Sequence, residues 1–426
     1  MERRDRPGGL LAVTRLNAVL SWGFVLAMGG VAVTSTADGA LLWAAVVTTV
    51  VGISVLPAVV LRDPAVMPPW ELLLLASVPV LWGSFVGSTF GSGIATYLSV
   101  AAIALVIAVD LDGFTAVRMN HAFAVGFVVI ATLAVAGVWA VVRWLADVAL
   151  GTAYLFDGRS GEAINAAVMV EFVYAALAGV GAGIVFDYYF RGRARTSDRS
   201  TGPPTAPAPE RDGRLRDRLG VPERYQRGAS RAMQATLALL VVGGLLAGSL
   251  SVVANGAVAL AITFVPAILE RDYELPMDPG LVLWITAAVF LHALGTVGPY
   301  EWPVRWDALT HALSASVVAA AGYTLVRAID IHSDEVYLPA RTMVVVLALF
   351  VLAAGVVWEI LEFLIDLAAT RLGVEAVLVQ HGIDDTVVDL LFDALGALVV
   401  ALWGTAYLAD VSTVVSERIG EWRGTD

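Results

Sequence analysis

The chain has 426 residues and a net charge of −12; 58% of its residues are hydrophobic, only 15% are charged, and its mean hydropathy is +0.79. Because soluble domains carry about 25% charged residues, this composition excludes an ordinary soluble protein and indicates several transmembrane helices. The chain has no cysteine, which excludes disulfides, thiolate metal sites, iron–sulfur clusters and cysteine nucleophiles.

The apolar runs of the chain approach the length that spans a hydrocarbon core about 30 Å thick. In chain order they lie at 10–33, 40–61, 70–88, 92–110, 121–150 and 164–189, then at 231–252, 256–269, 280–297, 307–328, 341–369 and 385–409. No small-residue cleavage site follows the first run, so we expect an uncleaved helix and not a signal peptide. The pattern predicts an all-α polytopic membrane protein with about 12 transmembrane helices.

The two halves of the chain resemble each other. Three pairs of segments match in order: Pro57–Asp63 with Pro266–Asp272, Asp38-Gly39-Ala40 with Asn255-Gly256-Ala257, and Val138-Trp139 with Val357-Trp358. Each half holds six apolar runs. Because six is an even number, we expect two parallel six-helix repeats related by an axis along the membrane normal.

We therefore divide the chain into four parts: a first, degenerate six-helix repeat (1–190), a linker rich in arginine and proline (191–230), a second six-helix repeat (231–410) and a tail (411–426). All 26 basic residues are arginine, a composition like that of proteins from salt-loving archaea. The arginines gather at both termini, in the linker and in alternate loops. The positive-inside rule then predicts a multi-pass protein of the cell membrane with both termini in the cytoplasm.

We expect the lipid bilayer as the partner of this protein, and no nucleic acid. The arginine-rich linker lacks the interleaved aromatic residues that nucleic-acid binding favours, and a solvated cytoplasmic tether explains its charge. The sequence does not specify an oligomeric state.

Ionisable residues occur at helical spacing inside three apolar runs of the last third. The eight that we predict to form a site are Asp307, His311, Glu359, Glu362, Asp366, Asp385, Asp389 and Asp393. A charge at the bilayer centre costs about 2.5–3.5 kcal/mol, and residues three or four apart share one helix face. We therefore expect these side chains to face one pocket in the outer half of the membrane, where they bind a cation or a proton.

Carboxylates and imidazole together suit Mg²⁺, Mn²⁺, Ca²⁺ or Zn²⁺. His311, Glu362 and Asp389 are the candidate metal ligands, and a divalent metal is the candidate cofactor, although the spacings match no dedicated metal motif. Arg305 and Arg371 are the nearby counter-charges, and His292, Glu301 and His381 lie on the same side. The alternative is structural: the acidic groups at helix ends are interfacial or cap helices, and the deeper ones join helices by hydrogen bonds.

The first repeat lacks this set of residues. The matching positions hold Ala140 for Glu359, Arg143 for Glu362, Asn165 for Asp385, Met169 for Asp389 and Val173 for Asp393, and only Asp147 keeps the carboxylate of Asp366. We therefore expect the first repeat to be a structural half.

Four motifs of the second repeat carry a resemblance to a known family. They are Phe264-Val-Pro-Ala with Glu270-Arg271, Trp306-Asp307-x-x-Thr310-His311, Trp358-Glu359-x-x-Glu362-Phe363, and Asp384-Asp385-Thr386 with Asp389, Asp393, Gly396 and Ala397. In this order they resemble the YjdF-like integral membrane proteins, a family of unknown function, over about residues 255–410. A looser likeness is to VanZ-like membrane proteins. The resemblance implies a membrane protein and the position of a site, and it implies no chemistry.

Three hypotheses for function remain open. The first is a transporter or ion-handling protein whose outer acidic pocket binds a divalent cation or a proton-coupled solute. The second is a membrane-embedded, metal-dependent enzyme acting on lipid or cell-envelope precursors, although no HExxH, GxSxG, SxxK or phosphate-binding loop occurs. The third is a scaffold or sensor in which the polar cluster only holds helices together.

Overall fold

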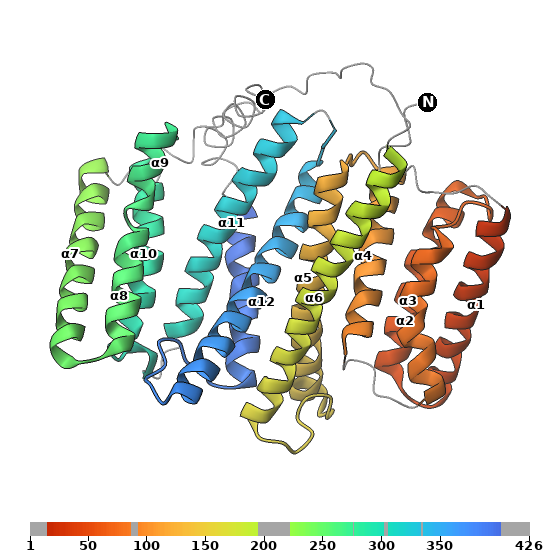
Figure 1. The fold of residues 1–426 in the computed structure, drawn as a ribbon, viewed down its shortest axis with the longest axis horizontal. Coiled ribbons are helices and arrows are strands. Elements are labelled where there is room, and N and C mark those ends of the chain that lie inside the picture. The colour runs from red at the N-terminus through yellow and green to blue at the C-terminus, as the bar shows by residue number, and fades with distance from the viewer. Residues whose placement is uncertain are drawn as a thin grey trace. The chain divides into compact units, whose positions relative to one another are not determined.

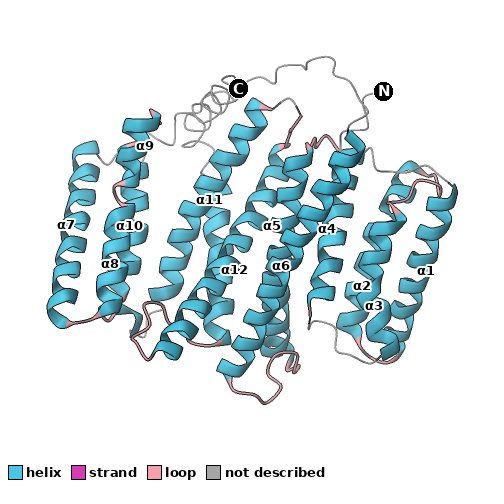
Figure 2. Ribbon diagram, viewed as in Figure 1, coloured by secondary structure: helices cyan, strands magenta, loops and turns pink. Residues whose placement is uncertain are grey.

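The computed structural model describes residues 15–86, 93–194, 222–275, 277–301, 306–333 and 335–401. The regular structure of these residues is helical, apart from one isolated backbone bridge between Arg118 and Tyr337 (Figure 2). Among the described helices, nine are long and apolar enough to cross a membrane, and two shorter apolar helices accompany them. The predicted class, an all-α polytopic membrane protein, is confirmed.

The helices follow the apolar runs of the sequence. They are α1 (Arg15–Ala37), α2 (Leu41–Leu61), α3 (Trp70–Val86), α4 (Ile94–Phe114), α5 (His121–Leu150), α6 (Gly161–Ala194), α7 (Glu223–Ala247), α8 (Leu250–Ile262), α9 (Val265–Tyr273), α10 (Pro279–Gly295), the short 3₁₀ helix η2 (Pro299–Glu301), α11 (Trp306–His332) and α12 (Ala340–Leu372). A last helix covers residues 383–401, and we call it the C-terminal helix. Within the described residues, each predicted run falls on one of these helices, with two exceptions: 231–252 continues from α7 past the turn into α8, and 256–269 falls on both α8 and α9.

Two compact units divide the chain. Unit 1 comprises Met1–Ala136, Val170–Gly202 and Ser333–Met343, and unit 2 comprises Gly137–Met169, Pro203–His332 and Val344–Asp426. Helices α5, α6 and α12 thus contribute to both units. The division of the chain into repeats at 1–190 and 231–410 stays a prediction.

In unit 1, α1 packs on α2 and α3, and α4 packs on the same two helices (Figure 1). Met67 and Leu73 are fully buried in this core. Asn17 of α1 is buried beside them: its Nδ2 lies 3.2 Å from the carbonyl oxygen of Met67 and 3.3 Å from that of Pro68, and its Oδ1 accepts from the Trp70 backbone N–H at 2.9 Å. A single amide therefore ties the connection between α2 and α3 to α1.

In unit 2, α7, α8 and α10 pack on one another, and α10 also packs on α11. Leu237, Ala259 and Ala293 form the core between the first three helices. Asn255 of α8 donates from Nδ2 to the carbonyl oxygen of Val377 at 2.8 Å. This bond joins α8 to the loop that precedes the C-terminal helix.

One predicted correspondence between the halves is wrong. Gly39 forms the turn between α1 and α2 with φ at 77°, but Asn255 and Gly256 lie inside α8. The Asn-Gly pair usually favours a turn. Here the missing side chain of Gly256 lets α8 approach α7, because a Cβ at this position would lie 3.1 Å from Val241.

The turn between α7 and α8 is made instead by Gly248, with φ at 72°, and by Ser249, whose hydroxyl accepts from the backbone N–H of Val252. Gly39 and Gly248 are 209 positions apart, which is also the separation of Pro57 and Pro266. The turns and the prolines therefore share one offset.

Helix α7 begins at Glu223, eight residues before the predicted run. Its first turns are polar, and Glu223 pairs with Arg227 at 2.9 Å in the i,i+4 spacing that supports a helix. The predicted linker (191–230) lies mostly, and the predicted tail (411–426) entirely, outside the described residues.

Candidate functional site

Three helices of unit 2 carry the predicted site residues: α11, the second half of α12, and the C-terminal helix. Small residues let these helices approach closely. A Cβ on Gly396 would lie 2.4 Å from the backbone oxygen of Ala312, so α11 touches the backbone of the C-terminal helix there. A Cβ on Gly355 of α12 would lie 2.3 Å from Oδ2 of Asp393. That glycine leaves the space in which the Asp393 carboxylate sits.

His311 is the centre of a buried cluster. Its Nδ1 lies 3.3 Å from Oδ1 of Asp393, within hydrogen-bonding distance. Its Nε2 lies 3.8 Å from Oδ2 of Asp389 and 3.9 Å from Oδ1 of Asp307. The ring therefore stands between three carboxylates, one on its own helix and two on the C-terminal helix.

The cluster becomes more buried along its length. The side chain of Asp307 is 33% exposed, whereas those of Asp389 and Asp393 are 4% and 8% exposed. Of these residues Asp307, at the N-terminal end of α11, is thus the most exposed. Asp307, His311 and Asp389 each offer one ligand atom, and these atoms lie within 4.8 Å of one another.

Glu359 of α12 is buried in a separate set of neutral partners. Its Oε2 accepts from Gln380 Nε2 at 2.9 Å and lies 2.8 Å from the hydroxyl of Thr386. Asn165 of α6 closes a ring: its Nδ2 donates to Gln380 Oε1 at 2.8 Å, and its Oδ1 lies 3.1 Å from the same Thr386 hydroxyl.

Glu362 points to an aromatic group. Its Oε1 accepts from the indole Nε1 of Trp358 at 2.8 Å. The Trp358 ring meets His292 edge-to-face at 6.0 Å, and His292 Nδ1 lies 3.0 Å from the hydroxyl of Tyr300. Glu362 interacts electrostatically with His311 and does not belong to the three-ligand group.

The remaining predicted residues lie at the edge. Asp385 contacts His381, whose Nδ1 lies 3.5 Å from its Oδ2. This contact raises the pKa of the His381 imidazole, because the neighbouring carboxylate favours the protonated ring. Asp366 is half-buried, and among the described residues it makes no hydrogen bond or ion pair. Asp384 accepts from Trp144 Nε1 at 2.6 Å.

Of the two predicted counter-charges, the structure describes only Arg371. Arg371 is exposed at the end of α12 and forms no ion pair with any residue that the structure describes. Arg305 and the side chain of Glu301 lie outside the described residues.

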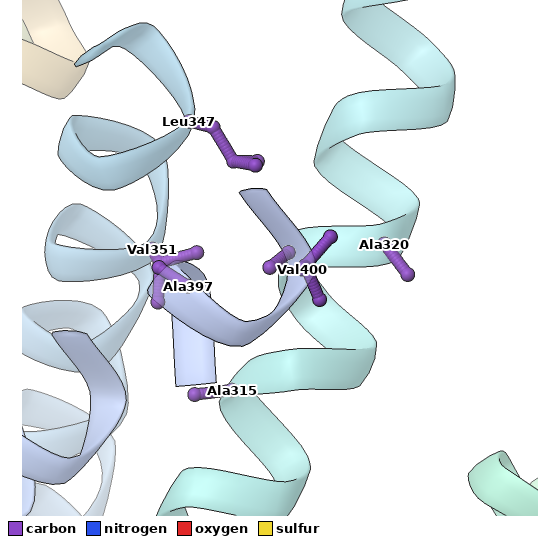
Figure 3. Close-up of a cluster of buried hydrophobic side chains, with 7 residues drawn as sticks. Ala315, Ala320, Leu347, Val351, Ala397 and Val400 are labelled. Carbon is purple, nitrogen blue, oxygen red and sulfur yellow. The ribbon is translucent and has the colours of Figure 1, made fainter. Parts of the chain in front are cut away.

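On the side away from Asp307, the site ends at packed apolar residues. Ala315, Ala319 and Ala320 of α11 meet Leu347 and Val351 of α12 and Ala397 and Val400 of the C-terminal helix, all of them buried (Figure 3). Ala315 and Ala397 come one helical turn after His311 and Asp393, so this cluster directly follows the charged one. We call it the apolar seal.

Sequence reasoning missed Gln380, Thr386 and Asn165 as neighbours of the site. All three are neutral, and Asn165 comes from the half that lacks the acidic residues. The one available signal was Thr386, which follows Asp384-Asp385 in the family motif.

Comparison with known proteins gives a family match for the second half of the chain. The family described as "Predicted membrane protein (DUF2238)" matches residues 229–410, which include all eight predicted site residues, and "Domain of unknown function (DUF8268)" matches residues 5–67. An uncharacterized protein of Thermotoga maritima is 30% identical over 140 residues, which are 32% of this chain and 68% of that protein. No solved structure matches the chain.

Proposed function

We propose that this multi-pass membrane protein, which belongs to the DUF2238 family of predicted membrane proteins that its YjdF-like motifs resemble, binds a divalent metal cation and transports it. The relative from Thermotoga maritima is itself uncharacterized. The proposal therefore stands on the geometry around His311.

The observation that carries the proposal is the group of Asp307, His311 and Asp389. Metal–nitrogen and metal–oxygen bonds are about 2.0–2.2 Å long, so one ion holds two ligand atoms about 3–4 Å apart. The separations of 3.8 and 3.9 Å between His311 Nε2 and the two carboxylates fall in this range. One imidazole and two carboxylates suit ions such as Mn²⁺ and Zn²⁺.

The position of Asp393 also supports a metal site at His311. Metal-binding histidines generally donate their second ring N–H to a carboxylate or carbonyl, which fixes the tautomer and the ring orientation. Asp393 lies on Nδ1 of His311 and leaves Nε2 directed at Asp307 and Asp389. A divalent charge would also offset the repulsion among these three carboxylates.

The position of the most exposed residue of the cluster favours entry of the ion from the outer face of the membrane. With both termini in the cytoplasm, as the arginine distribution predicts, the N-terminal end of α11 faces outward. The cluster then opens outward beside Asp307, and the apolar seal closes it toward the cytoplasm. Passage of an ion requires α11 to separate from the C-terminal helix, as in alternating access.

Metal binding is tested on purified protein. We expect Mn²⁺ or Zn²⁺ to bind with a stoichiometry near one in isothermal titration calorimetry, and Asp389→Asn or His311→Ala to abolish binding. Asp366→Asn is the matched control, because Asp366 is a carboxylate on a helix of the site without a contact to the cluster. Binding that survives in Asp389→Asn, or that Asp366→Asn removes equally, contradicts the site.

Transport is tested separately in proteoliposomes. Uptake of the ion that binds, lost in Asp389→Asn and kept in Asp366→Asn, supports a transporter. Binding without flux contradicts transport and favours the metal-dependent enzyme, in which a coordination position not taken by Asp307, His311 or Asp389 would hold water.

A further inference from the structure

Matching residues of the two halves meet each other. In unit 1, Arg118 and Tyr337, which precede α5 and α12 by three positions each, form the antiparallel bridge. The Arg118 N–H donates to the Tyr337 oxygen and the Tyr337 N–H donates to the Arg118 oxygen, both at 2.9 Å. Two equivalent residues that exchange both hydrogen bonds are related by a local two-fold axis.

The same relation occurs within unit 2. Gly137 of α5 and Val356 of α12 are 219 positions apart, as are Arg118 and Tyr337, and a Cβ on Gly137 would lie 2.9 Å from the Val356 side chain. At the start of the following helices the contact is one position from an exact match: Gly382 approaches the backbone of Gly161, whose counterpart is His381, with 3.7 Å between an added Cβ and the Gly161 carbonyl carbon. In a two-fold dimer, only residues near the axis contact their own counterparts.

Local side-chain contacts repeat as well. Trp139 and Arg143 of α5 are four residues apart, with the guanidinium over the indole at 5.5 Å. At the matching positions of α12, Trp358 donates to Glu362. Both halves thus pair an indole with an ionisable side chain four residues later, through the ring face in α5 and through the ring N–H in α12, and the charge is reversed.

We infer that the first half serves as a built-in partner subunit, and that its Asn165 positions the carboxylate of Glu359 in the second half. Asn165 takes the place of Asp385 in the repeat, yet its amide faces the second half. It donates to Gln380 Oε1, which turns Gln380 Nε2 toward Glu359. Met169, the counterpart of Asp389, contacts the same Gln380 nitrogen at 3.6 Å.

Asn165 is thus a positioning residue. Without it, the Gln380 amide loses the partner that fixes its orientation, and the Thr386 hydroxyl loses one of its two acceptors. Glu359 bonds Thr386, which comes three residues before Asp389 on the C-terminal helix, so its placement influences the cation site. This last step rests on the proposed function, whereas the positioning itself does not.

The positioning is tested in cation-free, full-length protein by a double-mutant cycle on the melting temperature. We expect Asn165→Leu and Gln380→Leu each to lower Tm, and the double variant to lower it by clearly less than their sum, because the two side chains share one bond. Trp284→Phe combined with Asn165→Leu is the control. Trp284 bonds Ser316 elsewhere in unit 2, so these shifts should add. Additive shifts for Asn165 with Gln380 would overturn the inference.

The effect on the site is measured by calorimetric titration with Mn²⁺. We expect Asn165→Leu to weaken affinity about three- to tenfold in the parent protein and to change nothing in a Glu359→Gln background. Equal weakening in both backgrounds overturns the claim that Asn165 acts through Glu359. If the parent binds no cation, the proposed function fails, and the melting-temperature cycle still decides the positioning role.

Discussion

Substituting Gly396 with alanine tests whether close helix contact builds the site. The new Cβ would lie 2.4 Å from the Ala312 oxygen, 2.9 Å from the Ser316 nitrogen and 3.0 Å from the Ala315 Cβ. Two of these atoms are backbone and cannot rotate away, so α11 and the C-terminal helix must separate by about 1 Å to restore ordinary contact distances. Overpacking of this kind costs about 1–3 kcal/mol.

Two readouts follow from that separation. At about 2–4 °C per kcal/mol, we expect Tm to fall by about 2–12 °C. Since Asp389 and Asp393 move with the C-terminal helix while Asp307 and His311 stay on α11, a displacement of about 1 Å exceeds the tolerance of about 0.5 Å for a binding constellation. We therefore expect Mn²⁺ affinity to fall at least tenfold, measured by calorimetry on the monodisperse protein.

Gly243→Ala is the matched control. Gly243 lies in α7 with open space where its Cβ would be, so alanine should leave Mn²⁺ affinity unchanged and should raise stability by up to about 1 kcal/mol. If Gly396→Ala keeps both its Tm and its affinity, the close contact of α11 with the C-terminal helix is refuted.

Three further predictions concern single residues. Glu359→Ala should lower the stability by about 1–3 kcal/mol, because the Gln380 and Thr386 donors lose their buried acceptor; an unchanged thermal unfolding curve would contradict the ring. Asp385→Asn should lower the pKa of His381 toward its usual value, because the carboxylate that favours the protonated ring is gone. NMR titration of the His381 Cε1 proton measures this pKa, and an unchanged midpoint would exclude the contact between Asp385 and His381. Asp147→Ala should destabilise the first half by several kcal/mol and leave Mn²⁺ affinity unchanged. The reason is that Asp147 accepts hydrogen bonds from Thr152 and from the backbone N–H groups of Tyr154, Leu155 and Phe156. Loss of affinity with an unchanged Tm would contradict this structural role.

The sequence predicts the helices of this fold well, because each span is a long apolar run that needs no knowledge of its neighbours. It does not predict features that depend on contacts between helices. The turn after α7 lies at Gly248 and not at Asn255, because Gly256 is needed for contact with Val241. The break between α8 and α9 at Thr263 and Phe264 also escaped prediction, since both residues lie inside an unbroken apolar run.

Spacing also predicts part of the candidate site. The i,i+4 pattern places Asp307 with His311, and Asp389 with Asp393, on single helix faces, and in the structure these faces meet. Glu362, which spacing predicts as a metal ligand beside His311 and Asp389, bonds Trp358 and is not one of the three residues whose ligand atoms lie together. Its partner Trp358 is four residues away on the same helix, and the sequence alone does not show whether Glu362 contacts Trp358 or the residues of the neighbouring helices. Asn165 could not be found because its role depends on contact between segments more than 200 residues apart.

Anomalous X-ray diffraction from crystals of the full chain grown with Mn²⁺ shows whether His311, Asp307 and Asp389 hold one metal ion. We expect a manganese peak about 2.0–2.2 Å from His311 Nε2 and from carboxylate oxygens of Asp307 and Asp389, with Asp393 on the other ring nitrogen. A map without a peak between these residues, or with the ion bound elsewhere in the chain, would contradict it.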